Sequence, residues 1–236
     1  MNEKENKNLF DMILNLSKYH KEHEKFYAQR PLEQAVTFQK SSRVLKTLAD
    51  RWKNISIQKN KALNPYMGCE DLNETSIIQE NGVLFMEGEG EPPEISRLKR
   101  DIGTLADDFE ETGGWLSKAM ESSWDAAKPL LEIPDIVSVL GERHRIIIND
   151  WQASYLSFLI SVLSKRAVEI LNKIDFSPHA LREGIDGLQI YVDYLYSASE
   201  LLDRAADIAC ESAILVHDNE KRWRMFHNKV DELSKK

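Results

Sequence analysis

Residues 181–230 read LREGIDGLQIYVDYLYSASELLDRAADIACESAILVHDNEKRWRMFHNKV, and this stretch decides the fold. Apolar and small side chains recur in it in alternating steps of four and three, over seven heptads from Leu181 to Val230. This spacing is typical of one long helix with a narrow apolar stripe, as in a coiled coil. Because one helix cannot bury its own stripe, other long helices must pack along it, from the same chain or from a partner. The positions expected in this packing or dimer seam are Leu188, Val192, Leu195, Leu202, Ala206, Ala209, Ala213, Val216 and Trp223.

The rest of the chain repeats the helical period twice. One rod is expected from about residue 7 to residue 53, either kinked at Pro31 or divided there into two helices. A second is expected from about Pro93 to Ile174, broken or bent at Pro129 and Pro134. The expected fold is all-α: a single elongated domain over residues 1–236, built as an antiparallel bundle of three long, proline-kinked helices. Residues 154–163 are apolar almost all round, so we expect them to be the most deeply enclosed part of the bundle.

Residues 55–93 differ from the rods in composition. They hold prolines and glycines, show no sustained helical period and carry an acidic block: residues 62–96 contain eight acids and no Lys or Arg. This predicts an acidic, flexible insertion between the first and second helices. The chain has a net charge of −8, with 39 acids and 31 bases, so removing the eight acids of this block leaves 31 of each. The helical body is therefore neutral overall.

Composition favours a soluble, intracellular protein. The sequence is 42% hydrophobic and 30% charged, and its first residues lack the apolar core of a secretory signal. The longest apolar patch, residues 153–163, is interrupted by serines and is too short to span a bilayer. Cys69 and Cys210 form no metal or redox spacing, which fits a reducing compartment. We expect a cytoplasmic protein, with peripheral association with endosomal membranes as a further possibility.

The sequence gives little support to an enzyme or a cofactor-binding protein. No phosphate loop, nucleophile elbow or catalytic thiol motif is present. His20, His23 and Glu24 are weak metal candidates because they share about one helical turn, but no histidine follows a glutamate at the three-residue spacing of di-iron bundles. Packing or solvated roles are the stronger interpretation for these three residues. We expect no catalytic residue, no cofactor and no nucleic-acid partner.

Basic residues are the more informative feature. Nine of them could form a shallow cationic surface for anionic lipid, where each cation close to the headgroups contributes about 1 kcal/mol. They are Arg97, Lys99, Arg100, Arg143 and Arg145, together with Lys165, Arg166, Lys173 and Arg182 near the last turn. The alternative interpretation, which the sequence favours slightly, is that each is a solvated charge opposite an acid.

The order of these parts resembles a BAR domain of the sorting-nexin kind. SSRVLKTLADRW (Ser41–Trp52) is similar to the end of the first BAR helix, and ERHR (residues 142–145), leading into NDWQASYLSFL (residues 149–159), resembles a stretch of the second. The long final rod ends in a basic aromatic patch at residues 221–226. Such domains join their first two helices by a short loop, whereas this chain has the acidic insertion there.

Three hypotheses for the function follow. The resemblance implies a homo- or heterodimeric scaffold that associates with anionic membranes or with trafficking proteins in endosomal sorting. The neutral helical body and the acidic insertion favour instead a protein-interaction or assembly module that touches no lipid. The third hypothesis is a metal-binding helical bundle, which rests on His20, His23 and Glu24 alone.

Overall fold

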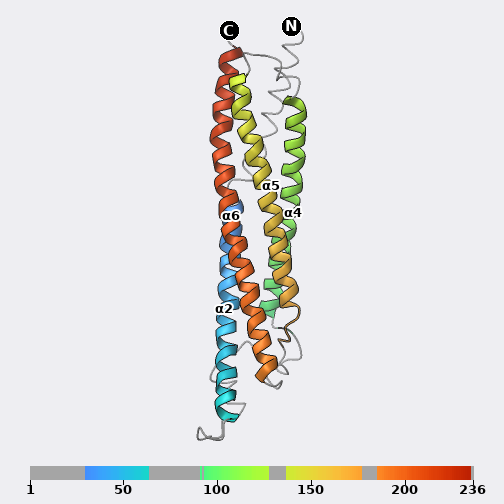
Figure 1. Cartoon of the computed structure of the whole chain (residues 1–236), viewed down its shortest axis with the longest axis vertical. Coiled ribbons are helices and arrows are strands. Elements are labelled where there is room, and N and C mark those ends of the chain that lie inside the picture. Colours follow the sequence, from blue (N-terminus) through green and yellow to red (C-terminus); the bar gives the residue numbers. More distant parts are fainter. Residues whose placement is uncertain (1–29, 64–90, 92, 128–136, 177–184, 235–236) are drawn as a thin grey trace. The chain divides into compact units, whose positions relative to one another are not determined.

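The computed structural model of the chain describes residues 30–63, 91, 93–127, 137–176 and 185–234. Within these ranges the protein is all-helical and contains no strand, which confirms the expected fold class. Figure 1 shows the described helices. They are α2 (Arg30–Leu63), α4 (Pro93–Ala127), α5 (Val137–Leu171) and α6 (Ile185–Ser234). These ranges thus hold four helices, where the sequence predicted three rods.

The difference arises in the second expected rod. α4 ends at Ala127 and α5 begins at Val137, and the two proline positions predicted as kinks lie between these ends in the sequence. A proline lacks the backbone N–H that a continuing helix needs, so it favours a helix end as readily as a bend. Pro31 stands in the first described turn of α2, where a missing N–H costs nothing. The chain before Arg30 lies outside the described residues.

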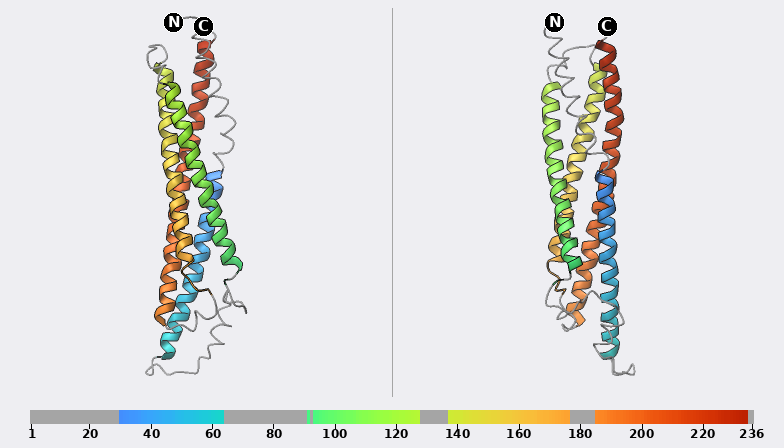
Figure 2. Two further views of the ribbon diagram at one scale, coloured as in Figure 1. Left: turned by 90° about the vertical axis from the view of Figure 1, so that its right-hand side faces the viewer. Right: turned by 180° about the vertical axis from the view of Figure 1, so that it is seen from behind.

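The residues divide into two compact units. Unit 1 is Met1–Ala35, Asp108–Ser161 and Asp207–Lys236, and unit 2 is Val36–Asp107 and Val162–Ala206. In unit 2, α2 lies beside α6, as both views of Figure 2 show. Lys46 of α2 pairs with Asp203 of α6, and the Tyr196 hydroxyl of α6 donates to Asp50 of α2.

The core of unit 2 is centred on Trp52, which is 1% exposed. Its ring meets those of Phe176 and Tyr191 edge to face, with centroids 5.8 and 6.2 Å apart. The Lys99 ammonium lies 5.2 Å from the centroid of the Phe176 ring on another side. This cluster joins α2, α6 and the segment that follows α5.

The long C-terminal helix is confirmed over its described length. α6 runs without a break through 50 residues, and the predicted start near Ser177 lies outside the described residues. The expected seam positions from Leu188 to Ala206 are buried in unit 2, and those at Ala209 and Ala213 are buried in unit 1. Val216 is partly buried, and the Trp223 side chain is outside the description. The predicted seam is therefore covered by other helices of the same chain from Leu188 to Ala213.

The boundaries of the acidic insertion change. α2 continues to Leu63, and Ile55 and Ser56 are buried in unit 2, so residues 55–63 belong to the first helix rather than to the insertion. The sequence obscured this because the polar run at residues 58–61 (QKNK) interrupts the apolar stripe after Ile55 and Ile57. α4 begins at Pro93, as predicted, and residues 64–90 are outside the description.

α4 and α5 approach each other closely at Gly113 in unit 1. A Cβ added there would lie 3.1 Å from the backbone oxygen of Ser154 and 3.2 Å from the Phe158 ring, whereas a Cβ on Gly114 would meet nothing within 4 Å. The Ser154 hydroxyl donates to the Gly113 carbonyl oxygen at 2.7 Å. Only the first glycine is thus required by packing.

These neighbouring glycines form a matched pair for a stability test. We expect Gly113→Ala to lower the free energy of unfolding by roughly 1–2 kcal/mol, because the α5 backbone has to move away. Gly114→Ala should instead raise it by roughly 0.5–1 kcal/mol, since alanine costs less backbone entropy in a helix. Urea denaturation followed by circular dichroism measures both. Equal effects of the two substitutions would contradict the described contact.

Candidate interaction surface

In unit 1, helix α5 buries several small residues and exposes large apolar ones. Ile146 and Ile147 are buried near the start of the helix, and from residue 153 on the buried face is built mainly from small residues: Ala153, Ser154, Ser157 and Ser161, with Ile160. The exposed side holds large apolar ones: Ile148, Trp151 and Tyr155, with Trp151 57% and Tyr155 62% exposed. Phe158 lies at the edge of this face, 39% exposed, with part of its ring against Gly113 of α4. A helix of a soluble protein normally places its large apolar residues inside. The expectation that residues 154–163 are the most enclosed part of the bundle is therefore wrong for Tyr155 and Phe158.

Buried serines in α5 are tolerated because their hydroxyls have partners. The Ser157 hydroxyl donates to the carbonyl oxygen of Ala153 at 2.8 Å, one turn earlier on the same helix. The Ser154 hydroxyl donates across to α4, as described above. Small side chains at these positions let neighbouring helices approach closely. The bulk of α5 is consequently left on its outer face.

A groove between α5 and α6 lies on this outer face of unit 1. It has a volume of about 640 Å³. Its lining residues are Trp151, Gln152, Tyr155 and Leu156 of α5 and Glu211, Ile214 and Leu215 of α6. Ile214 is 68% exposed. We call Ile148, Trp151, Tyr155, Phe158 and Ile214, together with the groove, the α5–α6 surface.

A polar cluster next to this surface, between residues 146–150 of α5 and 218–219 of α6, fixes the alignment of the two helices. The Asn219 side-chain amide donates to Asp150 Oδ1 at 2.7 Å and to the carbonyl oxygen of Ile146 at 3.3 Å. The Asn149 amide donates to Asn219 Oδ1 at 2.8 Å and to Asp218 Oδ2 at 3.4 Å. A shift of one helix along the other would break these bonds, so the cluster specifies one register.

The two aspartates of this cluster have opposite electrostatics. Burial raises the pKa of Asp150 to about 7, although the hydrogen bond from Asn219 opposes the rise. The hydrogen bond from Arg222, whose Nε lies 2.9 Å from Asp218 Oδ2, lowers the pKa of Asp218, and partial burial opposes this. Sequence reasoning missed the cluster because Asn219 falls beside the predicted seam position, Glu220. The sequence does carry one sign of the cluster: the dipeptide Asn149-Asp150 on one helix and its reverse, Asp218-Asn219, on the other.

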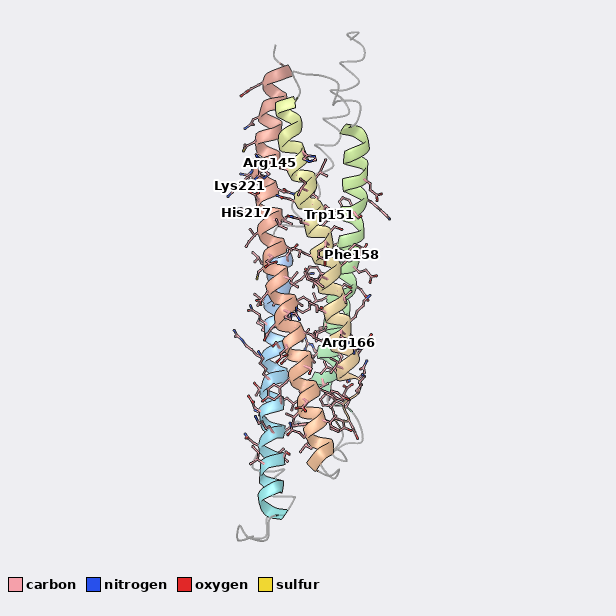
Figure 3. All side chains as sticks on the ribbon, viewed as in Figure 1. Arg145, Trp151, Phe158, Arg166, His217 and Lys221 are labelled. Carbon is pink, nitrogen blue, oxygen red and sulfur yellow. The ribbon has the colours of Figure 1, made fainter. Side chains whose placement is uncertain are left out.

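The charged residues around the α5–α6 surface are sorted by sign. Since the cluster aligns residue 149 with residue 219, positions before 149 on α5 and after 219 on α6 share one end. Figure 3 shows Arg145 and Lys221 at that end, with Trp151 and Phe158 farther along α5. Glu211 and Asp207 are exposed on α6 at the opposite end. Cations thus predominate at one end, where Asp218 is paired with Arg222; the middle is mainly apolar, with Glu211 at the edge of the groove, and Asp207 stands at the other end.

Most of the predicted lipid-binding cations stand beside acids. In unit 2, Lys165 lies 3.2 Å from Asp107, and Arg166 lies 2.6 Å from Glu169. Arg97 and Arg100 both approach Asp101, at 3.7 and 4.0 Å, and Lys99 pairs with Glu91. Lys173 is exposed in unit 2 and Arg145 in unit 1. The Arg143 side chain and the whole of Arg182 are outside the description.

The metal candidates His20, His23 and Glu24 also lie outside the described residues. Within the described ranges, no group of three or more His, Cys, Asp or Glu side chains is placed to hold a metal ion. By length and composition, the stretch His144–Leu171 satisfies the criteria for a membrane-crossing helix, with 39% of its most apolar window buried. This stretch is longer than the apolar patch at residues 153–163 that the sequence analysis identified. The serines between the apolar residues lower the mean hydropathy only slightly, so the helix meets the criteria over its longer length.

The α5–α6 surface is an exposed, mainly apolar part of unit 1. It combines exposed aromatic rings, a wide apolar groove and charges at its two ends. No protein-family model matches this chain, and no curated protein or solved structure is significantly similar to it.

Proposed function

We propose that this chain is a helical scaffold protein that works by protein–protein contact through the α5–α6 surface of unit 1. The observation that carries this proposal is the outward placement of Trp151 and Tyr155 beside Ile214. Aromatic residues grouped on an exposed apolar patch are typical of protein interfaces, and Trp and Tyr are enriched among the residues that dominate binding energy. Leaving them in water has a cost that a partner would remove.

The distribution of charge supports protein contact over lipid. Outside the acidic block, the chain has as many acids as bases. Five of the nine predicted cations also stand within ion-pair distance of a carboxylate. A cation whose field is offset by a neighbouring carboxylate attracts anionic headgroups less strongly.

Association with anionic membranes is the second candidate, and one observation favours it. Trp151 and Tyr155 are amphipathic residues on the exposed face of a helix, close to a basic end that includes Arg145. Such residues also anchor helices at a membrane surface. The sorting-nexin-like role expected from the sequence would place this contact on an endosomal membrane.

Vesicle co-sedimentation separates the two candidates. With vesicles containing phosphatidylserine at low salt, we expect the full chain to stay in the supernatant, both unchanged and as the Lys165→Glu/Arg166→Glu variant. Because electrostatic adsorption to headgroups is screened by salt, pelleting that salt abolishes would indicate lipid binding. Pelleting lost in the charge-reversed variant would favour the membrane candidate over the proposed one.

The scaffold proposal itself is tested by affinity capture from cells that express the chain. We expect Trp151→Glu/Tyr155→Glu to lose the captured proteins, including any second copy of the chain, while its circular dichroism stays unchanged. The matched control is Lys118→Glu, a charge change at an exposed position of α4 that lies outside the α5–α6 surface. Identical capture by all three proteins would overturn the proposal.

A further inference from the structure

We propose that the partner seated on the α5–α6 surface is a second copy of this chain, related to the first by a two-fold axis through the middle of the surface. This inference rests on the proposed function and names its partner. The seam that the sequence offered for a dimer is buried within the chain from Leu188 to Ala213. An assembly of two copies therefore needs a different surface, and unit 1 presents one.

The first argument is the spacing of the exposed side chains. Ile148, Trp151 and Tyr155 follow one another in steps of three and four, as the core positions of a helix-pairing seam do. Phe158, three residues farther on, extends the seam with the exposed part of its ring, while the rest packs against Gly113 of α4. A seam of this kind is covered best by another helical seam of the same spacing. A two-fold axis supplies one, because it brings the same surface patch of both copies together.

The second argument is the order of the charges. Rotation about a two-fold axis perpendicular to the helices places the basic end of one copy over the acidic end of the other. Counted at 1.5 Å per residue from the level of Tyr155, Arg145 lies about 15 Å toward one end. Asp207 lies about 10 Å toward the other end, counted from Ile214 at a similar level. The rotation brings these two residues to neighbouring heights, with the apolar groove between the two contacts.

The charges at both ends are available for such contacts. Arg145, Asp207 and Glu211 are exposed, and in the part of the chain that the structure describes none of them forms an ion pair. Lys221 is exposed beside Asp218, which already pairs with Arg222. Charge complementarity between two copies would thus use side chains that the fold leaves unpaired.

The size of the surface sets the expected strength. The exposed face from Arg145 to Phe158 is about 20 Å long, and two adjacent helices are about 20 Å wide with their side chains. The area of this face, about 400 Å², is smaller than the roughly 800 Å² that each partner contributes to a standard stable interface. We therefore expect a reversible dimer with a dissociation constant on the order of 10 µM.

The test is light scattering of the full chain over a range of concentrations, with two complementary charge variants. The basic-end variant is Arg145→Glu/Lys221→Glu, and the acidic-end variant is Asp207→Lys/Glu211→Lys. Each variant sets like charges against each other in a homodimer, so we expect each alone to dimerise at least tenfold more weakly than the unchanged chain. An equimolar mixture restores opposite charges at both contacts, and we expect it to dimerise about as well as the unchanged chain.

Restoration by mixing is the decisive result, because a fold defect in either variant would persist in the mixture. Lys118→Glu serves again as the control and should leave the dissociation constant unchanged. A chain that stays monomeric at 100 µM, or a dimer that neither variant weakens, would overturn the inference. So would a mixture that stays as weak as its components. A monomeric chain whose captured proteins still depend on Trp151 and Tyr155 would remove the second copy while leaving the scaffold proposal standing.

Discussion

Replacing Trp52 with alanine is expected to lower the free energy of unfolding by about 3–5 kcal/mol, because it empties the centre of unit 2. The indole is 1% exposed and meets two aromatic rings edge to face. Such pairs add roughly 0.5–1.5 kcal/mol beyond the burial of apolar area. α2, α6 and the segment after α5 all contact the indole or its ring partners, so neighbouring backbone has little freedom to fill the cavity.

Trp151→Ala is the matched control for this prediction. It removes the same side chain from a position that is 57% exposed, so the unfolding free energy should change by less than about 1 kcal/mol. Urea denaturation followed by circular dichroism at 222 nm, at a protein concentration well below the dissociation constant proposed for the dimer, measures both variants. A loss for Trp151→Ala as large as that for Trp52→Ala would mean that Trp151 is buried in solution, and would contradict the described surface.

The two tryptophans also show what the sequence could and could not predict. Trp52 lies on a clear apolar stripe with Phe38, Leu45 and Ala49, and all of them are buried as that stripe predicts. The heptad spacing predicted α6, and the proline at its first turn predicted the start of α4. Both features depend only on residues near one another in the sequence, so they can be recognised without the fold.

The exposure of Trp151 could not be predicted in the same way, because the helix around it is apolar on nearly every side. Periodicity cannot then say which face is covered, and helix α5 buries its serines rather than its aromatic residues. The division of the second rod into α4 and α5 was equally open, since a proline pair permits a bend or a helix end. Both questions are settled by tertiary packing around Gly113 and Ser154, which no local pattern contains.

The second large effect is expected from Asp150, in the polar cluster between α5 and α6, and concerns how the stability of the protein depends on pH. The pKa of Asp150 is about 7 in the folded protein, against an ordinary value of 3.8, because burial disfavours the carboxylate. The folded state therefore holds a proton that the unfolded chain has already released. This contribution to stability is fully present below pH 4 and is lost as the pH rises to about 7 and above.

Asp150→Asn should remove most of this dependence, because an amide keeps an oxygen for the Asn219 donor and carries no charge. A shift of about three pKa units corresponds to roughly 4 kcal/mol, and the partial exposure of Asp150 reduces the expected effect to about 2 kcal/mol. The variant should thus be about 2 kcal/mol more stable than the unchanged chain at pH 8, with a much smaller difference at pH 5. Urea denaturation at the two pH values measures this double difference.

Asp218→Asn is the control with the opposite sign. The bond from Arg222 lowers the pKa of Asp218, so its contribution to stability is present above the ordinary aspartate range and is lost only as the pH falls below it. Between pH 5 and pH 8 this substitution should leave the pH dependence unchanged. If Asp150→Asn shows the same pH dependence as the unchanged chain, its carboxylate is solvated and the cluster does not bury it. If only Asp150→Asn flattens the dependence, the register of α5 and α6 is maintained by a buried acid that is protonated at low pH and ionised above about pH 7.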